Sequence, residues 1–327
     1  MVDQSENTAS GMYQVPAREI HVPDHISAIA RMYLTPQPTS PGYPALDDKA
    51  AWRAYVDAVD ASVLPLLQQM GAHATADVTE LNLANAHVFD IVPPGLSPDD
   101  HSVVLEMHGG ALILCGGEAC KLMGIGAAVR FGRRTWSVNY RMPPEHPYPA
   151  GLDDCIAAYR ALLAERSPSE IIVSGGSAGG NLAAALILRA RDEGLPMPAG
   201  VILNTPEIDL TESGDSFQTN LGVDPGLGSL ITVNQLYANG EDLRHPYLSP
   251  LFGDLRDFPP TILTTGTRDL YLSNTVRMHR ALRAAGVAAE LHVTEAGAHI
   301  GFPGAPEGQA IDAEICAFID KVLVPKG

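Results

Sequence analysis

Short apolar runs alternate with helical stretches along most of the chain from residue 103 onward. The apolar runs predict strands over residues 103–107, 135–139, 171–174, 200–204, 261–265 and 290–293. Most are separated by stretches whose apolar residues recur every three or four positions, which predict helices over 118–130, 152–165, 178–191, 273–285 and 309–322. Strands that alternate with helices are typical of an α/β fold with a mostly parallel, doubly wound sheet.

Three stretches depart from this rhythm. Alternating apolar residues over 81–93 predict edge strands ahead of the main sheet. Residues 22–71, with helical patterns around 46–70, and residues 211–245, rich in Gly, Asn and Asp, are candidate pieces of a cap. The predicted organisation is an N-terminal lead and cap segment over 1–71, then a core over 72–327 with a cap insertion at about 211–245.

Composition and charge narrow the classes of protein. The formal net charge is −17, which argues against nucleic acid or an anionic membrane as partner, since both require basic groups. Residues 1–10 lack the basic and apolar regions of a secretory signal, so we expect a short disordered lead there. No stretch is long and apolar enough to span a bilayer, so a cytoplasmic protein is expected. The four cysteines form no C-x-x-C pair or zinc-ligand grouping, which predicts reduced, mostly buried thiols and no metal site.

A glycine-flanked serine follows the strand predicted at 171–174. The segment Gly175-Gly-Ser177-Ala-Gly179 has the G-x-S-x-G pattern and leads directly into a predicted helix. In this strand–turn–helix context the pattern favours a nucleophilic serine over a plain tight turn. A Cβ at Gly175 or Gly179 would collide with the strand or helix packed against the turn, so both glycines are required.

A second glycine cluster ends the strand predicted at 103–107. In His108-Gly109-Gly110-Ala111 the glycines allow backbone N–H groups to approach a ligand oxygen, as an oxyanion-binding loop requires. The alternative is a glycine turn that serves only to reverse the chain. We expect His108 to order this loop rather than to carry protons.

A serine nucleophile requires a general base and an acid that orients the base. His299 lies in a glycine-punctuated loop between the last predicted strand and the final helix, and loops at strand ends are where catalytic groups collect. Asp269, in the loop after the strand at 261–265, is the preferred acid because it completes the order Ser, Asp, His. Glu207 and Asp209, which follow the preceding strand, are competing candidates.

With these residues identified, the chain resembles the bacterial hormone-sensitive-lipase-like family of α/β-hydrolase esterases over nearly its whole length. Residues 108–111, 139–150 and 175–180 look like the family's H-G-G-G, Y-R-x-x-P-E-x-x-x-P-A and G-D-S-A-G-G motifs. The resemblance implies an α/β-hydrolase fold with a mostly helical cap. It also implies that Ser177, Asp269 and His299 form the triad.

Two positions depart from the family motifs. Ala111 replaces the third glycine of the oxyanion motif, and Gly176 replaces the acidic residue before the nucleophile. Neither change removes a reacting group, since alanine still offers a backbone N–H. The expected oxyanion hole combines the N–H groups of Gly109 and Gly110, or of Ala111, with that of Ala178.

The expected activity is a serine carboxylesterase that hydrolyses short-chain carboxylic esters through an acyl-enzyme, with no metal or organic cofactor. A lactonase is the alternative, because a cyclic ester presents the same carbonyl to the same groups. A small-molecule-binding protein on this fold, or an interaction scaffold, is a further alternative that retention of all three triad residues disfavours. The expected partner is a small-molecule ester or lactone, and the predicted strand at 290–293 could form the edge of a homodimer.

Overall fold

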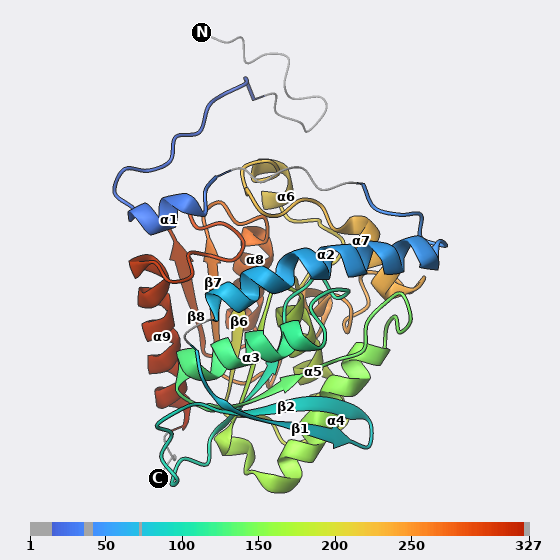
Figure 1. Ribbon diagram of the computed structural model, residues 1–327, viewed down its shortest axis with the longest axis vertical. Helices are drawn as coiled ribbons and strands as arrows, with labels where there is room; N and C mark the ends of the chain where they lie inside the picture. The colour runs from blue at the N-terminus through green and yellow to red at the C-terminus, as the bar shows by residue number, and fades with distance from the viewer. Residues whose placement is uncertain (1–14, 36–41, 72–73, 324–327) are drawn as a thin grey trace.

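The computed structural model describes residues 15–35, 42–71 and 74–323 and contains one eight-stranded sheet (Figure 1). The predicted disordered lead, residues 1–10, lies outside the described residues. The strand order is β1-β2-β4-β3-β5-β6-β7-β8. The strands are β1 Asp77–Leu83, β2 Ala86–Val92, β3 Val103–Met107, β4 Arg134–Val138, β5 Ile171–Gly176, β6 Gly200–Asn204, β7 Thr261–Gly266 and β8 Ala289–Thr294. From β4 to β8 all neighbours in the sheet are parallel, as the sequence predicts.

The prediction of edge strands over 81–93 is only partly right. This region contains the end of β1 and all of β2, but β2 pairs antiparallel with both β1 and β4, so of these two strands only β1 lies at an edge of the sheet. The start of β1 was not predicted, because Asp77, Thr79 and Glu80 are exposed and polar and the strand lacks an apolar run. Strand β2 is mostly buried, since it lies inside the sheet.

The helices cover both faces of the sheet. They are α1 Ala28–Met32, α2 Lys49–Met70, α3 Glu118–Phe131, α4 Ala150–Glu165, α5 Ala178–Asp192, α6 Ser216–Thr219, α7 Ile231–Ala238, α8 Leu272–Ala284 and α9 Pro306–Leu323, with short 3₁₀ turns at Pro168–Glu170 and Pro250–Phe252. Among the described residues, no helix has both the length and the apolar character needed to cross a bilayer.

Successive residues of each central strand pack on opposite layers of helix. Val104, Ile172, Ile202 and Ile262 form one apolar cluster with residues of α3 and α9. Their chain neighbours, among them Leu105, contact α4, α5 and α8 on the other face. Burial on both faces explains why these strands read as continuous apolar runs rather than as alternating ones.

The described parts of the two candidate cap segments, 22–71 and 211–245, gather at one end of the molecule, where Figure 1 shows α1, α2, α6 and α7 together. Trp52 of α2 and Phe217 of α6 belong to one apolar cluster with Val233 of α7. Ile113 and Tyr271, from the loops after β3 and β7, belong to the same cluster. Helical elements therefore pack over the carboxyl ends of the central strands.

Candidate active site

Ser177 stands at the junction of β5 and α5, in a conformation that local sterics impose. Its φ of 56° and ψ of −123° are unusual for a residue with a side chain. A Cβ on Gly175 would clash with the backbone of Gly179, and one on Gly179 would clash with the carbonyl of Met107. The predicted need for both glycines is confirmed. The Ser177 N–H donates to the Asn204 carbonyl at 2.9 Å, which ties the turn to the end of β6.

The other two predicted residues meet at this serine. The Nε2 of His299 lies 2.8 Å from the Oγ of Ser177, and its Nδ1 lies 3.1 Å from Oδ1 of Asp269. Asp269 is fully buried and also accepts hydrogen bonds from the Thr265 hydroxyl at 2.7 Å and the Tyr271 N–H at 2.9 Å. A serine hydroxyl, an imidazole and a carboxylate thus form a continuous chain of hydrogen bonds.

Neither competing acid takes the place of Asp269 beside the imidazole. Asp209 forms an ion pair with Arg277 at 2.7 Å and accepts from the hydroxyls of Thr211 and Ser213. Glu207 is buried, and within the described residues neither of its carboxyl oxygens has a hydrogen-bond partner. Neither acid bonds to His299, so the geometry selects Asp269 as its partner.

The electrostatic surroundings favour the protonated form of His299. Burial lowers its pKa, but the hydrogen bond and charge of Asp269, with the charges of Asp224 and Glu207, outweigh burial and raise the pKa above its ordinary value. Tyr271 packs the edge of its ring against the imidazole, with ring centroids 4.8 Å apart. This environment suits a group that gains a proton from a serine and holds it briefly.

The glycine loop after β3 lies directly against Ser177. A Cβ built on Gly109 would stand 3.5 Å from that of Ser177. Within the part of the chain that the structure describes, the backbone N–H groups of Gly109, Gly110, Ala111 and Ala178 donate no hydrogen bond. Donors without partners beside the serine are what an oxyanion would require.

His108 holds the loop in place, as expected. Its ring stacks on Tyr140 at a centroid distance of 4.1 Å, and its Nδ1 lies 2.7 Å from the Gly109 carbonyl. Burial lowers the pKa of His108 to about 4, so its ring is neutral near pH 7. Helix α2 holds the end of the same loop, because the Oδ1 of Asp60 accepts from the Cys115 N–H at 2.9 Å.

The comparisons with known proteins agree with this geometry. The sequence profile of the alpha/beta hydrolase fold family matches residues 104–303. A crystal structure of an esterase has a TM-score of 0.85 at 34% identity and covers 95% of this chain and 99% of that one. A crystal structure of an esterase from the bacterial hormone-sensitive lipase family has a TM-score of 0.74 at 30% identity, covering 90% and 95%. The chain belongs to the bacterial hormone-sensitive lipase family of α/β-hydrolases.

Two sequence relatives carry the names of ester-cleaving enzymes. An esterase from Acinetobacter venetianus is 34% identical over 193 residues, which is 57% of this chain. An acetyl-hydrolase from Streptomyces hygroscopicus is 32% identical over 190 residues, again 57% of this chain. The chain spans 62% and 64% of the lengths of these two proteins.

The structure accounts for both departures from the motifs of the hormone-sensitive lipase family. Ala111 has a φ of 52°, in the left-handed region that glycine occupies most readily, and alanine is the smallest alternative that retains the N–H. At Gly176 a Cβ would find its nearest atom 3.7 Å away, so a side chain fits there. Gly176 is therefore not required by the turn, in contrast to Gly175 and Gly179.

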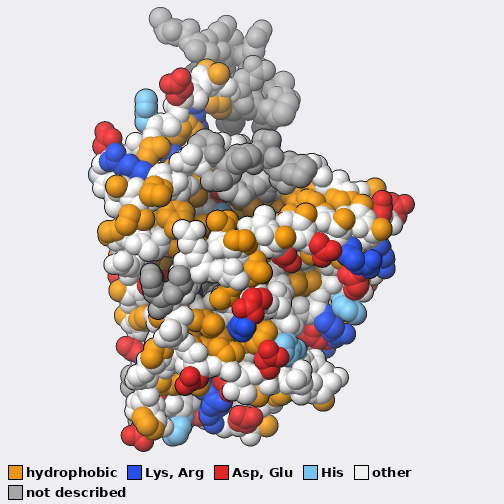
Figure 2. Space-filling view, viewed as in Figure 1, with side chains coloured by type: hydrophobic (Ala, Val, Ile, Leu, Met, Phe, Trp, Pro, Cys, Tyr) orange, Lys and Arg blue, Asp and Glu red, His pale blue; other side chains and the backbone are white. Residues whose placement is uncertain are grey.

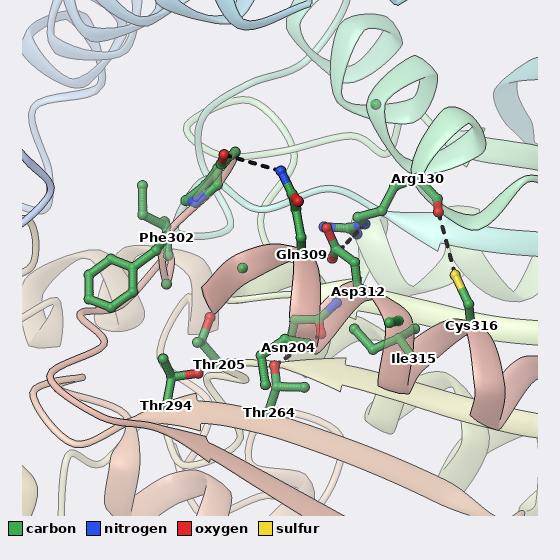
Figure 3. Close-up of a pocket in the computed structure, with 18 of the residues that line it drawn as sticks. Arg130, Asn204, Thr205, Thr264, Thr294, Phe302, Gln309, Asp312, Ile315 and Cys316 are labelled. Atoms are coloured by element: carbon green, nitrogen blue, oxygen red, sulfur yellow. Dashed lines mark hydrogen bonds and ion pairs between the residues drawn. The ribbon is translucent and has the colours of Figure 1, made fainter. Parts of the chain in front are cut away.

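A cavity of about 610 Å³ lies beside the carboxyl ends of β6, β7 and β8 (Figure 3). Asn204, Thr205 and Thr264 contribute its polar part, whereas Phe302 and Ile315 contribute apolar walls. Two hydrogen bonds connect its lining to the predicted site residues. The Asn204 carbonyl accepts from the Ser177 N–H, and the Thr265 hydroxyl donates to Asp269. Helices α2, α3 and α9 also contribute to the lining of the cavity.

All four cysteines are free thiols. Cys115, Cys120 and Cys155 are buried, and Cys316 is half-buried. Burial raises the pKa of both Cys115 and Cys120 to about 12, so these thiols are unreactive. Over residues 15–35, 42–71 and 74–323, no group of three or more His, Cys, Asp or Glu side chains could hold a metal ion.

One residue in contact with the site was not predicted. Asp224, in the 211–245 insertion, is buried and accepts a hydrogen bond from the backbone N–H of His299 at 3.1 Å. A single aspartate in a segment rich in Gly, Asn and Asp carries no local signal. Only the packing of the insertion against the strand-end loops reveals it.

Proposed function

We propose that the protein is a serine carboxylesterase in which Ser177 is the nucleophile, His299 the general base and Asp269 the acid that orients it. The observation that carries the proposal is the chain of hydrogen bonds from the Ser177 Oγ through His299 to Asp269, at 2.8 and 3.1 Å. The names of the relatives and structural neighbours support cleavage of carboxylic esters.

The reaction begins when the Ser177 oxygen attacks the ester carbonyl carbon while the Nε2 of His299 takes the hydroxyl proton. The N–H groups of Gly109, Gly110 and Ala178 stabilise the negative oxygen of the tetrahedral intermediate. When the intermediate collapses, the imidazolium donates its proton to the leaving alcohol and an acyl-enzyme remains. Water, deprotonated by His299, then hydrolyses the acyl-enzyme and regenerates the serine.

Residues 1–71 and the 211–245 insertion act as the cap in this proposal. The cluster that joins Trp52, Phe217 and Val233 to Tyr271 supports the assignment, because it packs both segments over the strand ends that carry the triad. Such a cover excludes water from the reacting carbonyl and limits the size of the acyl and alcohol groups.

The experiment is hydrolysis of p-nitrophenyl esters of increasing acyl length by the wild type and by Ser177→Ala. We expect turnover of short esters that falls by at least about a thousandfold in Ser177→Ala, with an unchanged circular dichroism spectrum. Turnover retained by this variant would contradict the assignment of the nucleophile. A lactone panel run in parallel tests the substrate class, because turnover of lactones alone would contradict the carboxylesterase.

A further inference from the structure

The 211–245 insertion carries three buried polar residues at intervals of four. Ser216, Asn220 and Asp224 have exposed fractions of 2%, 8% and 5%. Buried polar side chains are retained where they find hydrogen-bond partners. The partners of these three lie in the loops that carry Asp269 and His299.

Ser216 and Asn220 bind the backbone around Asp269. The Ser216 hydroxyl donates to the Leu270 carbonyl at 2.6 Å. The side-chain amide of Asn220 donates to the carbonyls of Thr267 at 3.2 Å and Asp269 at 2.9 Å. These bonds fix the acid loop from the side of the insertion.

Asp224 alone reaches both loops. Its Oδ2 accepts from the N–H of Leu270 at 3.0 Å and from the N–H of His299 at 3.1 Å. Its Oδ1 accepts from the N–H groups of Gly226 at 3.0 Å and Leu227 at 3.2 Å, which closes the turn of its own segment. One oxygen of the Asp224 carboxylate therefore joins Leu270, the residue after Asp269, to His299.

We propose that Asp224 is a positioning residue for the reaction, which fixes the separation of the loops bearing Asp269 and His299 and places a second negative charge beside the imidazole. This inference rests on the proposed function. The two loops also bond directly, from the Arg268 N–H to the Gly297 carbonyl at 2.9 Å, and Asp224 adds the bond at His299 itself. A base displaced by a fraction of an ångström loses its alignment with the nucleophile.

The charge of Asp224 raises the pKa of His299, as the charges of Asp269 and Glu207 do. The groups that face His299 are Asp269, Asp224, Glu207 and the ring edge of Tyr271. The three carboxylates raise the pKa of the imidazole, against the effect of burial. Removing the charge of Asp224 therefore lowers that pKa, whereas a loss of stability alone, with Asp269 still bonded to His299, leaves it unchanged.

The test compares Asp224→Asn with Asp209→Asn. In Asp224→Asn the amide oxygen can still accept from Gly226 and Leu227, but its NH₂ group then faces two N–H donors. We expect kcat/KM for a short ester to fall about 10- to 100-fold, mainly in kcat, and the acid limb of its pH profile to move to lower pH. Asp209 is a buried carboxylate just before the insertion, and its side chain bonds to Thr211, Ser213 and Arg277 rather than to either loop. Its variant therefore retains the acid limb and loses only stability.

A folded Asp224→Asn protein whose kcat/KM is within twofold of the wild type, or whose acid limb does not move, would overturn the proposal. If Asp224→Asn does not fold, Asp224→Glu takes its place, because the charge stays and the carboxylate moves. The expected result is then a reduced kcat with an acid limb near that of the wild type, and a wild-type kcat would overturn the proposal. Failure of the triad itself is seen separately, as turnover retained by Ser177→Ala.

Discussion

The turn around Ser177 and the loops around Asp269 and His299 reach the same site by different physical means. The serine turn is held by close backbone packing, because Gly175 lets β5 approach the start of α5 and Gly179 lets α5 approach the Met107 carbonyl at distances that no side chain permits. The other two loops bond to each other and are held in addition by hydrogen bonds from a distant segment, through Asn220 and Asp224.

This difference shows how a nucleophile and its base can be positioned independently. Close packing that only glycine permits leaves a motif in the sequence, because the glycines stand at fixed positions within one short turn. Hydrogen bonds between segments far apart in the chain position a loop equally well, but their donors and acceptors follow no fixed spacing between the partners. The following substitutions test each kind of support.

The largest expected effect comes from removing the acid, Asp269. In Asp269→Asn the imidazole loses the carboxylate that orients it and stabilises its charge, so kcat for a short ester falls by about 10³- to 10⁴-fold. The fold is retained, since Asn has the same shape. Steady-state kinetics measures kcat, and a thermal melt checks that the fold is retained. A loss of kcat below tenfold would exclude Asp269 as the acid.

The second effect tests the steric support of the serine turn. In Gly179→Ala the added methyl clashes with the Met107 carbonyl, and we expect a loss of at least about 3 kcal/mol in the free energy of unfolding. Gly176→Ala is the matched control, because its methyl finds its nearest atom at 3.7 Å and costs less than about 1 kcal/mol. Urea unfolding of both variants checks the contrast, and equal losses would refute it.

The third effect concerns Glu207, whose N–H donates to the Ser177 carbonyl at 3.0 Å and whose carboxyl is buried. Burial raises its pKa from 4.5 to about 7, so folding favours the protonated form. The folded protein then holds a proton that the unfolded chain has lost, and stability falls as the pH rises from about 4.5 to about 7.

Glu207→Gln removes this pH dependence because glutamine does not ionise. We expect the variant to be more stable than the wild type at pH 8, by up to about 3 kcal/mol, and similar to it at pH 4. Thermal melts across this range measure the difference. A constant difference at all pH values would show that Glu207 does not titrate on folding.

The smallest effect concerns the oxyanion loop, where Ala111 has a φ of 52°. Ala111→Gly relieves the left-handed strain, and we expect a gain below about 1 kcal/mol in the free energy of unfolding. The opposite sign is expected for Ala54→Gly on the exposed face of α2, with a loss of about 1 kcal/mol. Chemical denaturation measures the free energy of unfolding of both variants. A lower value for Ala111→Gly than for the wild type would contradict backbone strain at Ala111.

Most of the fold could be predicted because the central strands are buried on both faces. Strands β3 and β6 begin and end where the sequence predicts, and the bounds of β4, β5, β7 and β8 differ by one or two residues. Strand β1 was found only in part, since its exposed polar residues hide the strand pattern. The position of β2 inside the sheet depends on its pairing with β4, which no local pattern encodes.

The sequence by itself determined the order of strands and helices along the chain, the serine turn and the glycine loop, because apolar periodicity and closely spaced glycines are visible within short stretches of sequence. It also identified Asp269 and His299 as candidates by their places after strands. Only the tertiary structure separated Asp269 from Glu207 and Asp209, and brought Asp224 against His299. Each of those choices depends on distances of about 3 Å between residues far apart in sequence, which are set when the loops pack against the insertion.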